Sequence, residues 1–518
     1  MKFSFSQQEV IDLRNKNILV SAAAGSGKTT VLVERIIRLI INEKEDIDKF
    51  LIVTFTNAAA NGMKQKIHKA LIKELQSGEN KAHLVKQLNL LNRSSISTIH
   101  AFCIDIVRKN FHIIGIDPNF RIGDTNEVEI LLQEAIDDVL EKCYEEKSDA
   151  FIHLVEGFTG NRGDGELNEI IKDIYKFSLS FPEPLKWLYE SVEMLSMHGD
   201  ELENSEWMNA VRESLTLQLE GAGEMLTSAI GLCREDDGPS VYEEALTEDL
   251  NNLSSLKMLL RSDFRDFIRH AHGVVFPALK ALRGEAKEAT DPEKQEEARS
   301  LREEYKKIIS NIKKMIPNRE LSEFVHDINY MYPPMHALYN IISELDTLFK
   351  IRKMEKAIAD FNDVEHYALH ILRQEDIGER YKNKFKYIFI DEYQDSNSLQ
   401  EELISTIKRE NNMFMVGDVK QSIYRFRLSD PDIFNEKSSS YPAFNGLGND
   451  RRIDLTQNFR SRKEILHGIN YVFKSIMNKT LGEVDYNSEV FLNPGAEFRE
   501  SCSDFGECYT ELLIIDKD

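Results

Sequence analysis

The chain of 518 residues is long enough for several domains, and its 42% of hydrophobic residues is enough to build sizeable cores. Acidic side chains number 88 against 65 basic ones, so the formal net charge at pH 7 is −23. This balance excludes a generally basic surface. A nucleic-acid site would therefore have to be a local groove lined by aromatic side chains and a few Lys or Arg residues.

The five cysteines are scattered and show neither a C-x-x-C spacing nor a zinc-like set of ligands. Reduced thiols in a cytosolic protein are the expected state. The sequence shows no apolar leader and no run long enough to cross a bilayer, which predicts a cytoplasmic protein without membrane contact.

Residues 5–11 predict a short helix ahead of the first strand. Gln7 on this helix could present its amide to the edge of an adenine, although a glutamine on a helix surface is more often only solvated. On its own the glutamine therefore does not indicate a nucleotide site.

The most informative stretch is ILVSAAAGSGKTT at residues 18–30. Its apolar start predicts a buried strand, its small residues predict a tight turn, and the apolar residues after it recur at helical spacing. A strand, a glycine-rich turn and a helix form the setting of a phosphate-binding loop, whose backbone N–H groups and helix dipole hold phosphate oxygens. Lys28 would reach the β- and γ-phosphates of ATP, and the Thr29 hydroxyl would ligate Mg²⁺.

One residue departs from the usual G-x-x-x-x-G-K-[ST] pattern, because Ala22 stands at the position of the first glycine. Alanine fits if the backbone there needs no positive φ. The alternative, a glycine-rich turn that arose by chance, is disfavoured by the flanking strand and helix patterns. The predicted nucleotide-binding residues of this stretch are Ala22, Ala23, Ala24, Gly25, Ser26, Gly27, Lys28, Thr29 and Thr30.

Two further strands are predicted at residues 50–53 and 95–98. The first ends in Thr54-Phe55-Thr56-Asn57 before a helix that starts near residue 58, and the second enters a helix at His100. Ligands of open α/β sheets collect at the carboxyl ends of strands, so Phe55 could stack on a base, although it could equally belong to the core. His100 by itself would more often be a structural histidine than a functional one.

From residue 126 to residue 360 the pattern changes to helical periodicity with few strand signals. Residues 161–165 and 236–239 are predicted loops. Charge-rich runs such as residues 285–307 are expected to be solvated helix faces, and no chemistry-bearing cluster stands out. This part of the chain is predicted to be a helical insertion rather than part of the sheet.

A buried-strand pattern returns at residues 385–390 and ends in Asp391 and Glu392. Acidic residues are common in the turns that follow strands, so the pair alone is ambiguous. Beside a phosphate-binding loop it predicts the second half of a nucleotide-hydrolysis site, in which Asp391 holds Mg²⁺ and Glu392 polarises the attacking water.

The next predicted strand, residues 413–416, leads into GDVKQSIYRFR. Gln421 is placed to sense a γ-phosphate. Tyr424 and Phe426 alternate with two arginines, a combination that suits single-stranded nucleic acid because aromatic rings stack on bases and the cations meet phosphate. The alternative is a partly buried aromatic loop.

Residues 453–462 precede a helix predicted to begin at Lys463. Arg460 is a candidate arginine finger, and Phe459 is a candidate for stacking on adenine. The last apolar run, residues 511–516, predicts a strand.

In this order, AAAGSGKT, TFTNAAA, STIHAFC, DEYQD, GDVKQSIYRFR and LTQNFRSR resemble the consecutive motifs of the UvrD/Rep-like helicases of superfamily 1. The similarity is closest to the A subunits of the AddAB (RexAB) ATP-dependent helicase–nucleases. Four features point there: Ala23 in the loop, PNFRI at residues 118–122 before Asp124, RLSDP at 427–431, and DFNDVEH at 360–366.

The resemblance implies a role for each motif residue. It assigns the adenine contacts to Gln7 and Phe459, the phosphates and Mg²⁺ to the loop with Asp391 and Glu392, and the γ-phosphate to Gln421 and Arg460. It implies a single-stranded DNA path along Phe55, Thr56, Asn57, His100, Tyr424 and Phe426. Phe426 stands where the UvrD-like enzymes often have tryptophan.

The implied fold is α/β, a RecA-like P-loop NTPase parallel sheet with a large all-α insertion and the start of a second RecA-like domain. The expected boundaries are 1–125 and 361–437 for the first RecA-like domain, 126–360 for the helical insertion, and 438–518 for the opening of the second domain. Neither T-x-H-x-x-K-G-L-E-like nor V-A-x-T-R-A-like segments nor a nuclease signature is found. The chain is therefore expected to be the N-terminal part of a longer protein.

The implied activity is ATP-dependent translocation on single-stranded DNA, 3′ to 5′ by resemblance, with duplex unwinding in double-strand-break repair beside an AddB-like (RexB-like) partner. The chain alone is expected to bind ATP without unwinding DNA. Two alternatives remain from the residues themselves: a P-loop ATPase switch that does not translocate, and a module that binds DNA or a partner.

Overall fold

The computed structural model describes residues 3–77, 80–158, 165–199, 201–444, 446, 448–482, 484–498 and 513. Contacts divide the chain into two compact units. The first unit spans residues 1–146, 159–187 and 341–518, and the second spans residues 147–158 and 188–340.

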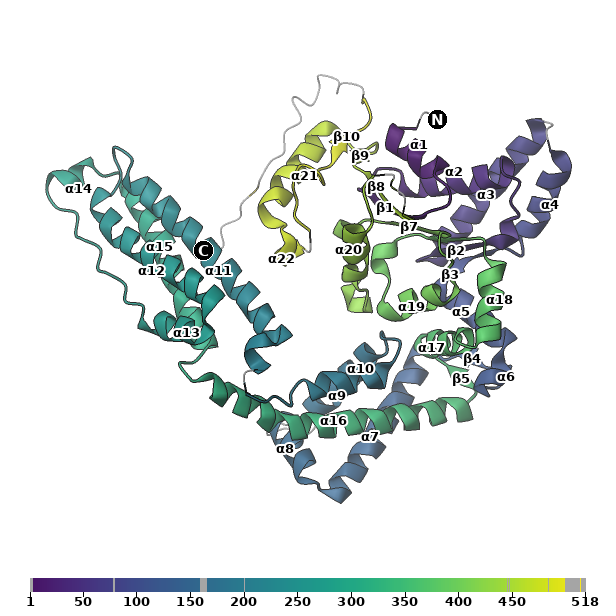
Figure 1. The fold of residues 1–518 in the computed structure, drawn as a ribbon, viewed down its shortest axis with the longest axis horizontal. Coiled ribbons are helices and arrows are strands. Elements are labelled where there is room, and N and C mark those ends of the chain that lie inside the picture. Colours follow the sequence, from purple (N-terminus) through teal and green to yellow (C-terminus); the bar gives the residue numbers. More distant parts are fainter. Residues whose placement is uncertain are drawn as a thin grey trace. The chain divides into compact units, whose positions relative to one another are not determined.

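A parallel sheet of six strands forms the centre of the first unit (Figure 1). The strand order is β3-β2-β6-β7-β1-β8, and every neighbouring pair is parallel. The strands are β1 (Asn17–Ala22), β2 (Phe50–Thr54), β3 (Ser95–Thr98), β6 (Tyr387–Ile390), β7 (Met413–Gly417) and β8 (Asp450–Leu455). The α/β fold class with a parallel sheet and a large helical insertion is thus confirmed.

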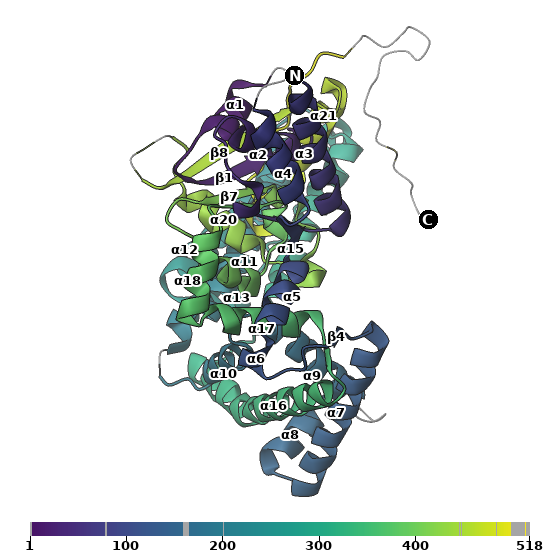
Figure 2. The same ribbon diagram turned by 90° about the vertical axis from the view of Figure 1, so that its right-hand side faces the viewer.

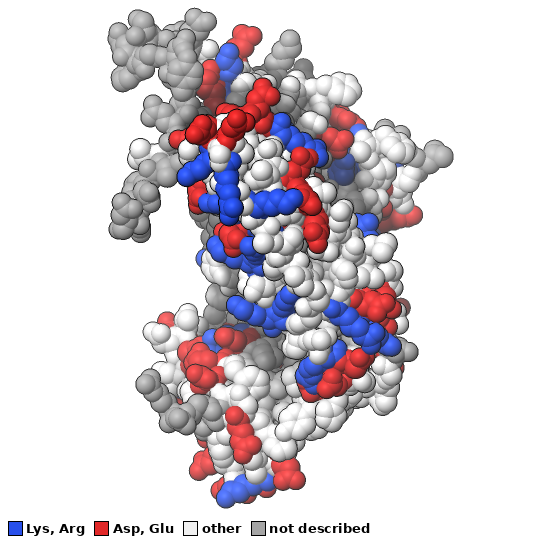
Figure 3. All heavy atoms as spheres, turned by 90° about the vertical axis from the view of Figure 1, so that its left-hand side faces the viewer, with Lys and Arg blue, Asp and Glu red and all other residues white. Residues whose placement is uncertain are grey.

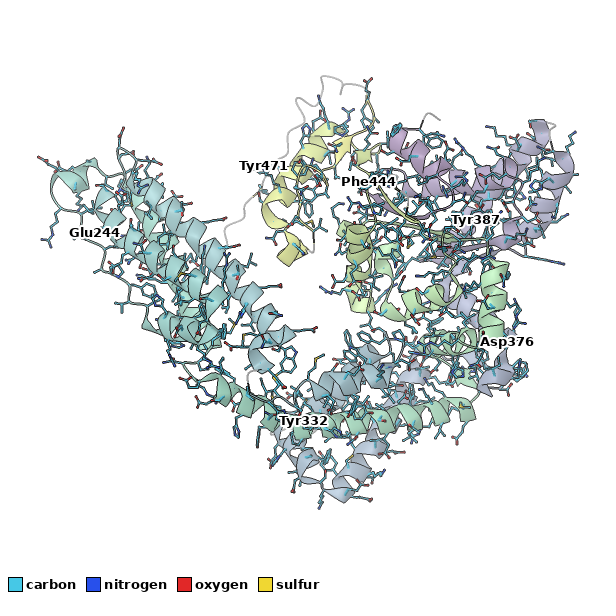
Figure 4. All side chains as sticks on the ribbon, in the orientation of Figure 1. Glu244, Tyr332, Asp376, Tyr387, Phe444 and Tyr471 are labelled. Atoms are coloured by element: carbon cyan, nitrogen blue, oxygen red, sulfur yellow. The ribbon has the colours of Figure 1, made fainter. Side chains whose placement is uncertain are left out.

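Alternate side chains of each strand point to opposite faces of the sheet, and both faces are buried. On β1, Ile18 and Val20 belong to one core and Leu19 belongs to the other. On β6, Tyr387 packs edge-on against Phe50 of β2, with ring centroids 5.2 Å apart (Figure 4). This burial on both sides explains why the strands are continuous apolar runs in the sequence.

Two groups of helices cover the sheet (Figures 1 and 2). The first core is closed by α1 (Phe5–Asp12), α2 (Lys28–Ile41), α3 (Asn57–Ser77) and α4 (Lys81–Leu91). The second core is closed by α5 (Ile99–Lys109), α17 (Phe361–Leu372), α18 (Glu375–Lys384), α19 (Ser398–Ile407) and α20 (Pro431–Ser440). The carboxyl ends of the strands are left for the loops that carry the predicted site.

A helical segment separates β3 from β6 in the sequence. The two ends of this segment are joined by a short pair of parallel strands, β4 (Arg121–Ile122) and β5 (Ile358–Ala359). The short helix α6 (Phe111–Ile114) comes just before β4 in the chain. Between the two strands, the described residues form only helices and connections. The α-helices are α7 (Thr125–Glu146), α8 (Asp149–Phe158), α9 (Gly165–Ser178), α10 (Pro184–Glu193), α11 (Glu206–Cys233), α12 (Glu243–Ser262), α13 (Phe264–Gly273), α14 (Glu285–Ala289), α15 (Pro292–Met315) and α16 (Leu321–Glu355).

The second unit is built mainly from α11, α12, α13, α15 and the first half of α16, which enclose one apolar core. On α16, Tyr332 (Figure 4) donates a hydrogen bond to Glu193 at 2.7 Å. The loop expected at residues 236–239 is present, whereas residues 161–164 of the other predicted loop lie outside the described part of the chain.

A buried ion pair crosses this core. The Arg302 guanidinium donates to an Asp249 carboxylate oxygen at 2.6 Å and to the Pro277 carbonyl at 2.6 Å. Both charged side chains are almost fully buried, and burial raises the pKa of Asp249 despite the neighbouring guanidinium. The pair therefore compensates two charges that water cannot reach.

Replacing Arg302 with alanine should lower the free energy of unfolding by about 3–5 kcal/mol, because the Asp249 carboxylate would stay buried without its partner. Urea denaturation followed by circular dichroism measures this change. Replacing the exposed Lys307 of the same helix should cost at most about 1 kcal/mol. Equal effects of the two substitutions would contradict the prediction, and the double variant Arg302→Met, Asp249→Leu should recover most of the loss.

The last described elements are β9 (Gln457–Asn458), α21 (Lys463–Ile476), α22 (Lys479–Gly482) and β10 (Asn493–Pro494), and β9 pairs in parallel with β10. The helix predicted at Lys463 is confirmed, and it carries the exposed Tyr471 (Figure 4). β8, which the sequence places among the residues expected to open the next domain, pairs with β1 along its whole length. The strand expected at residues 511–516 lies, except for Leu513, outside the described residues.

The distribution of charged side chains on the surface fits the excess of acidic over basic residues in the sequence. On the face shown in Figure 3, the described Lys and Arg side chains are interspersed with Asp and Glu. Among the described helices, none has the length and apolar character needed to cross a membrane. Cys103, Cys143 and Cys233 are free thiols, and the other two cysteines are not among the described residues.

Candidate functional site

The glycine-rich turn connects β1 to α2 and needs its glycines for their backbone. Gly25 and Gly27 have φ of +71° and +84°, a region that other residues rarely adopt. Gly27 is the N-cap of α2, so the free N–H groups of the first helical turn face the loop. Ala22 is the last residue of β1 and has no positive φ, so alanine is accommodated where the usual pattern has glycine.

The segment after β8 is bound directly to this loop. The Asn458 side-chain amide donates to the Ala24 carbonyl at 2.7 Å, and its oxygen accepts from the backbone N–H groups of Arg460 and Ser461 at 2.8 Å. Gly25 lies so close that a Cβ there would be 2.6 Å from the Asn458 nitrogen. Asn458 therefore fixes the position of Arg460 beside the phosphate-binding turn.

Of the two candidates on this segment, Phe459 donates its backbone N–H to the Gly25 carbonyl at 2.9 Å. Its ring is partly exposed and packs against Gly495. The Arg460 side chain is exposed and makes no hydrogen bond or ion pair with the described residues. The backbones of both residues thus lie beside the loop, and contacts of their side chains with a nucleotide stay a prediction.

Gln7 also lies against the loop. Its amide nitrogen donates to the Ser26 carbonyl at 2.9 Å, and its oxygen accepts from the Ser4 backbone N–H in a capping box. The side chain is buried rather than solvated. The structure therefore ties Gln7 to the glycine-rich turn, and its contact with adenine stays a prediction.

The acidic pair stands at the carboxyl end of β6. Lys28 forms an ion pair with Glu392, with Nζ 2.9 Å from Oε2. Glu392 has φ of +54°, an uncommon backbone for a residue that is not glycine, and such conformations cluster at functional sites. Gln394 donates to Glu392 at 3.0 Å and to Asp395 at 3.2 Å. The fold thus holds the predicted base against the predicted phosphate-binding lysine.

The electrostatics of this cluster favour a cation. Burial, and next the charge of Glu392, raise the pKa of Asp391 to about 6, and the same causes raise the pKa of Asp395 to about 6. Asp391 lines one cleft with Thr29, so a hydroxyl and a carboxylate face the same space. Hard oxygen donors of this kind fit Mg²⁺, which also neutralises the excess negative charge.

A chain of hydrogen bonds connects the acidic pair with the loop after β7. Gln421 donates to Asp418 at 2.6 Å, and the Asp418 backbone N–H donates to the Gln394 side chain at 2.9 Å. Lys420 forms an ion pair with Asp418 at 2.8 Å. Gln421 lines the same cleft as Thr29. Sequence reasoning missed Gln394, Asp418 and Asn458, although Gln394 and Asp418 follow the ends of β6 and β7, where site residues collect, and Asn458 lies in the short strand β9 that follows β8.

Three of the predicted DNA-contacting rings lie together, and they are called here the aromatic cluster: Phe55, Tyr424 and Phe426. Ring centroids are 4.7 Å apart between Phe55 and Tyr424, and 5.9 Å apart between Tyr424 and Phe426. The Arg427 guanidinium lies over all three rings, 5.0 Å from that of Tyr424. Phe426 is 76% exposed, so this loop is not a buried one.

The other predicted DNA-path residues are placed differently. Thr56 and Asn57 are exposed at the start of α3. His100 does not join the aromatic cluster but contacts Phe361, with ring centroids 4.8 Å apart. The structure thus brings Phe55, Tyr424 and Phe426 together and gives His100 a separate environment.

A parallel sheet with a glycine-rich phosphate loop after β1 and a lysine-paired glutamate after β6 defines a P-loop nucleotide-hydrolysing protein. The UvrD/REP helicase N-terminal domain family matches residues 3–442, and the chain belongs to this family. The family uses a nucleotide.

Curated relatives agree with the resemblance to helicase–nuclease A subunits. The A subunit of the ATP-dependent helicase/nuclease from Alkaliphilus metalliredigens is 46% identical over 513 residues, which cover 99% of this chain and 42% of the relative. The protein of the same name from Alkaliphilus oremlandii is 46% identical over 495 residues, covering 95% and 41%. That from Clostridioides difficile is 39% identical over 537 residues, covering 100% and 42%. The chain therefore spans about two fifths of the length of these relatives.

Proposed function

We propose that this protein couples ATP hydrolysis to movement along single-stranded DNA and thereby unwinds duplex DNA. One observation carries the proposal. A single cleft of about 660 Å³ is lined both by Thr29 and Asp391 of the nucleotide site and by Phe55 and Tyr424 of the aromatic cluster. The residues that would hydrolyse ATP and those that would stack on bases therefore line the same cleft, as the coupling of hydrolysis to movement along DNA requires.

In this proposal each polar residue has one task. Lys28 leaves Glu392 to meet the β- and γ-phosphates, which frees the carboxylate to polarise the attacking water. Thr29 and Asp391 would hold Mg²⁺, which supplies charge stabilisation to the phosphoryl group. Gln421 and Arg460 approach the γ-phosphate from the loops after β7 and β8. Because Gln421 is bonded through Asp418 to Gln394, which donates to Glu392, the loop that carries Tyr424 is connected to the catalytic carboxylate.

The relatives named above are helicase/nuclease subunits, and we extend that role to this protein as part of the proposal. It would act in double-strand-break repair on single-stranded and duplex DNA beside an AddB-like partner. Translocation from 3′ to 5′ rests on the family resemblance alone. The aromatic cluster supports the single-stranded substrate, since exposed rings beside arginine stack on bases of any sequence.

The test is ATP turnover with and without single-stranded DNA. We expect strong stimulation by DNA, loss of all turnover in Lys28→Ala, and loss of the stimulation alone in Tyr424→Ala. Turnover that ignores DNA in the unchanged protein would favour a nucleotide switch that does not translocate. Full activity of Lys28→Ala would favour a module that binds DNA or a partner without hydrolysis.

Replacing Asn458 with alanine should weaken ATP binding by about 5- to 100-fold, because the Ala24 carbonyl and the N–H groups of the Arg460 turn would lose a buried partner. Isothermal titration with a non-hydrolysable ATP analogue measures this affinity. Asn449→Ala, which removes an exposed asparagine that bonds Glu410, is the matched control. An affinity equal to that of this control would contradict the role of Asn458.

A further inference from the structure

We propose that a chain of polar contacts through Tyr393, Glu401 and Lys437 positions the general base of the site and connects it to the loop of the aromatic cluster. The base is Glu392, the residue before Tyr393, and the chain determines how strongly single-stranded DNA stimulates ATP hydrolysis. This inference rests on the proposed function, because it concerns the same base and the same DNA-stimulated turnover. It adds three positioning residues, which act on the reaction through Glu392.

Tyr393 directly follows the residue whose backbone is strained. Glu392 has φ of +54°, and a residue other than glycine keeps such a conformation only where its surroundings enforce it. The Tyr393 ring is 1% exposed and belongs to the second core, where its centroid lies 6.3 Å from that of Phe434 on α20. A fixed ring at this position restricts the backbone angles of Glu392 and thereby the direction of its carboxylate.

The Tyr393 hydroxyl is the polar end of this anchor. It donates to Glu401 of α19 at 2.6 Å, and Lys437 of α20 forms an ion pair with the other oxygen of the same carboxylate at 2.7 Å. Burial, and next the charge of Glu401, hold the pKa of Tyr393 well above its usual range, so the hydroxyl stays a donor. Hydrogen bonds to a charged acceptor are stronger than those between neutral groups. The loop after β6 is therefore bound firmly to two helices.

α20 begins just after the loop of the aromatic cluster, which ends beyond Phe426. The backbone N–H of Asp430, the N-cap of α20, donates to the Ser396 carbonyl in the loop after β6 at 2.8 Å. Lys437 lies in the last turn of the same helix. Both ends of α20 are thus bound, directly or through the carboxylate on α19, to the segment that follows Glu392. A displacement of the aromatic loop by DNA would reach the base along this helix.

Phe55 provides a second connection between the aromatic cluster and the base. A cavity of about 40 Å³ is lined, among other residues, by Phe55, Glu392 and Glu401. Tyr393 lines the same cavity. The ring that would stack on a base of DNA and the carboxylate that would polarise water therefore face the same small space as the anchor.

A second buried arrangement of the same kind provides a matched control. Tyr175 is 2% exposed and donates to Asp346 at 3.1 Å, and Lys350 forms an ion pair with the other oxygen of that carboxylate at 2.7 Å. None of these three residues lines the cleft of the nucleotide site. Changes in this arrangement therefore show what a buried tyrosine hydroxyl contributes to stability alone.

The first experiment measures ATP turnover at saturating single-stranded DNA, with urea denaturation to compare the stability of the variants. Tyr393→Phe should lower kcat by about 10- to 100-fold and leave the KM for ATP nearly unchanged, because the base is misplaced while the phosphate loop is intact. Tyr175→Phe should shift the urea midpoint by a similar amount and leave kcat unchanged. Equal kcat values for Tyr393→Phe and Tyr175→Phe would overturn the inference.

Lys437 tests the connection to DNA without a change in the buried ring. Lys437→Met should reduce the ratio of turnover with DNA to turnover without DNA by about 2- to 30-fold. Lys437→Arg should retain the ratio, because a guanidinium can still pair with Glu401. Lys350→Met, the matched control, should also retain it. A ratio in Lys437→Met equal to that in Lys350→Met would overturn the role of the chain in stimulation by DNA.

The same assays separate this inference from the proposed function. If DNA does not stimulate turnover of the unchanged protein, the proposed function fails and the inference fails with it. If DNA does stimulate turnover, and Tyr393→Phe and Lys437→Met both behave like their controls, only the inference is wrong.

Discussion

Replacing Arg460 with alanine should slow ATP hydrolysis by about 10³- to 10⁵-fold and leave ATP affinity nearly unchanged. The reason is geometric. Asn458 binds both the Ala24 carbonyl of the phosphate loop and the Arg460 backbone N–H, so the Arg460 backbone is anchored beside the loop, and its guanidinium makes no hydrogen bond or ion pair with the described residues. An arginine held in this way acts on charge that develops during phosphoryl transfer, which binding measurements do not detect.

Steady-state turnover at saturating single-stranded DNA gives kcat, and titration with an ATP analogue gives the affinity. Arg462→Ala is the matched control, since it removes the same charge two residues further along the chain. Arg460→Lys should restore only part of the rate, because an ammonium cannot form the two parallel hydrogen bonds of a guanidinium. Similar rates for Arg460→Ala and Arg462→Ala would remove Arg460 from the site.

Much of the sheet could be predicted because both of its faces are buried. Strands of this kind are continuous apolar runs, as at residues 18–20, 50–53 and 413–416, and the structure has strands at each of them. Helical periodicity likewise revealed the segment after residue 126, in which the long helices of the second unit bury apolar faces in one core. The phosphate loop was readable because its glycines and lysine act through local backbone geometry.

The site residues that could not be predicted from the sequence owe their positions to contacts between distant parts of the chain. Asn458 meets Ala24 only because β8 adds to the sheet beside β1, and a pattern of neighbouring residues carries no information on that pairing. Gln394 and Asp418 bond to each other for the same reason, because β6 and β7 are adjacent. His100 lies beside Glu365 because α5 packs against α17, although a long helical segment separates these two helices in the sequence.

Replacing Glu392 with glutamine should lower kcat by about 10²- to 10⁴-fold, the contribution of a positioned general base. Glutamine has the same shape and can still accept from Gln394, so the loop after β6 should keep its conformation. ATP should bind as tightly as before or more tightly, because Lys28 no longer has to leave an ion pair to reach the phosphates. Single-turnover hydrolysis and analogue binding, measured on the same preparation, separate the two effects.

Asp395→Asn distinguishes a lost base from a lost charge. Asp395 belongs to the same acidic cluster, and the charge of Glu392 contributes to its raised pKa, yet its carboxylate is held by Gln394 instead of by Lys28. If Glu392 acts on the attacking water, Asp395→Asn should change kcat by less than about tenfold, because it removes only a charge that interacts with Glu392 and leaves the base in place. If both substitutions slowed hydrolysis equally, the net charge of the cluster would control the rate, and Glu392 would not be the base.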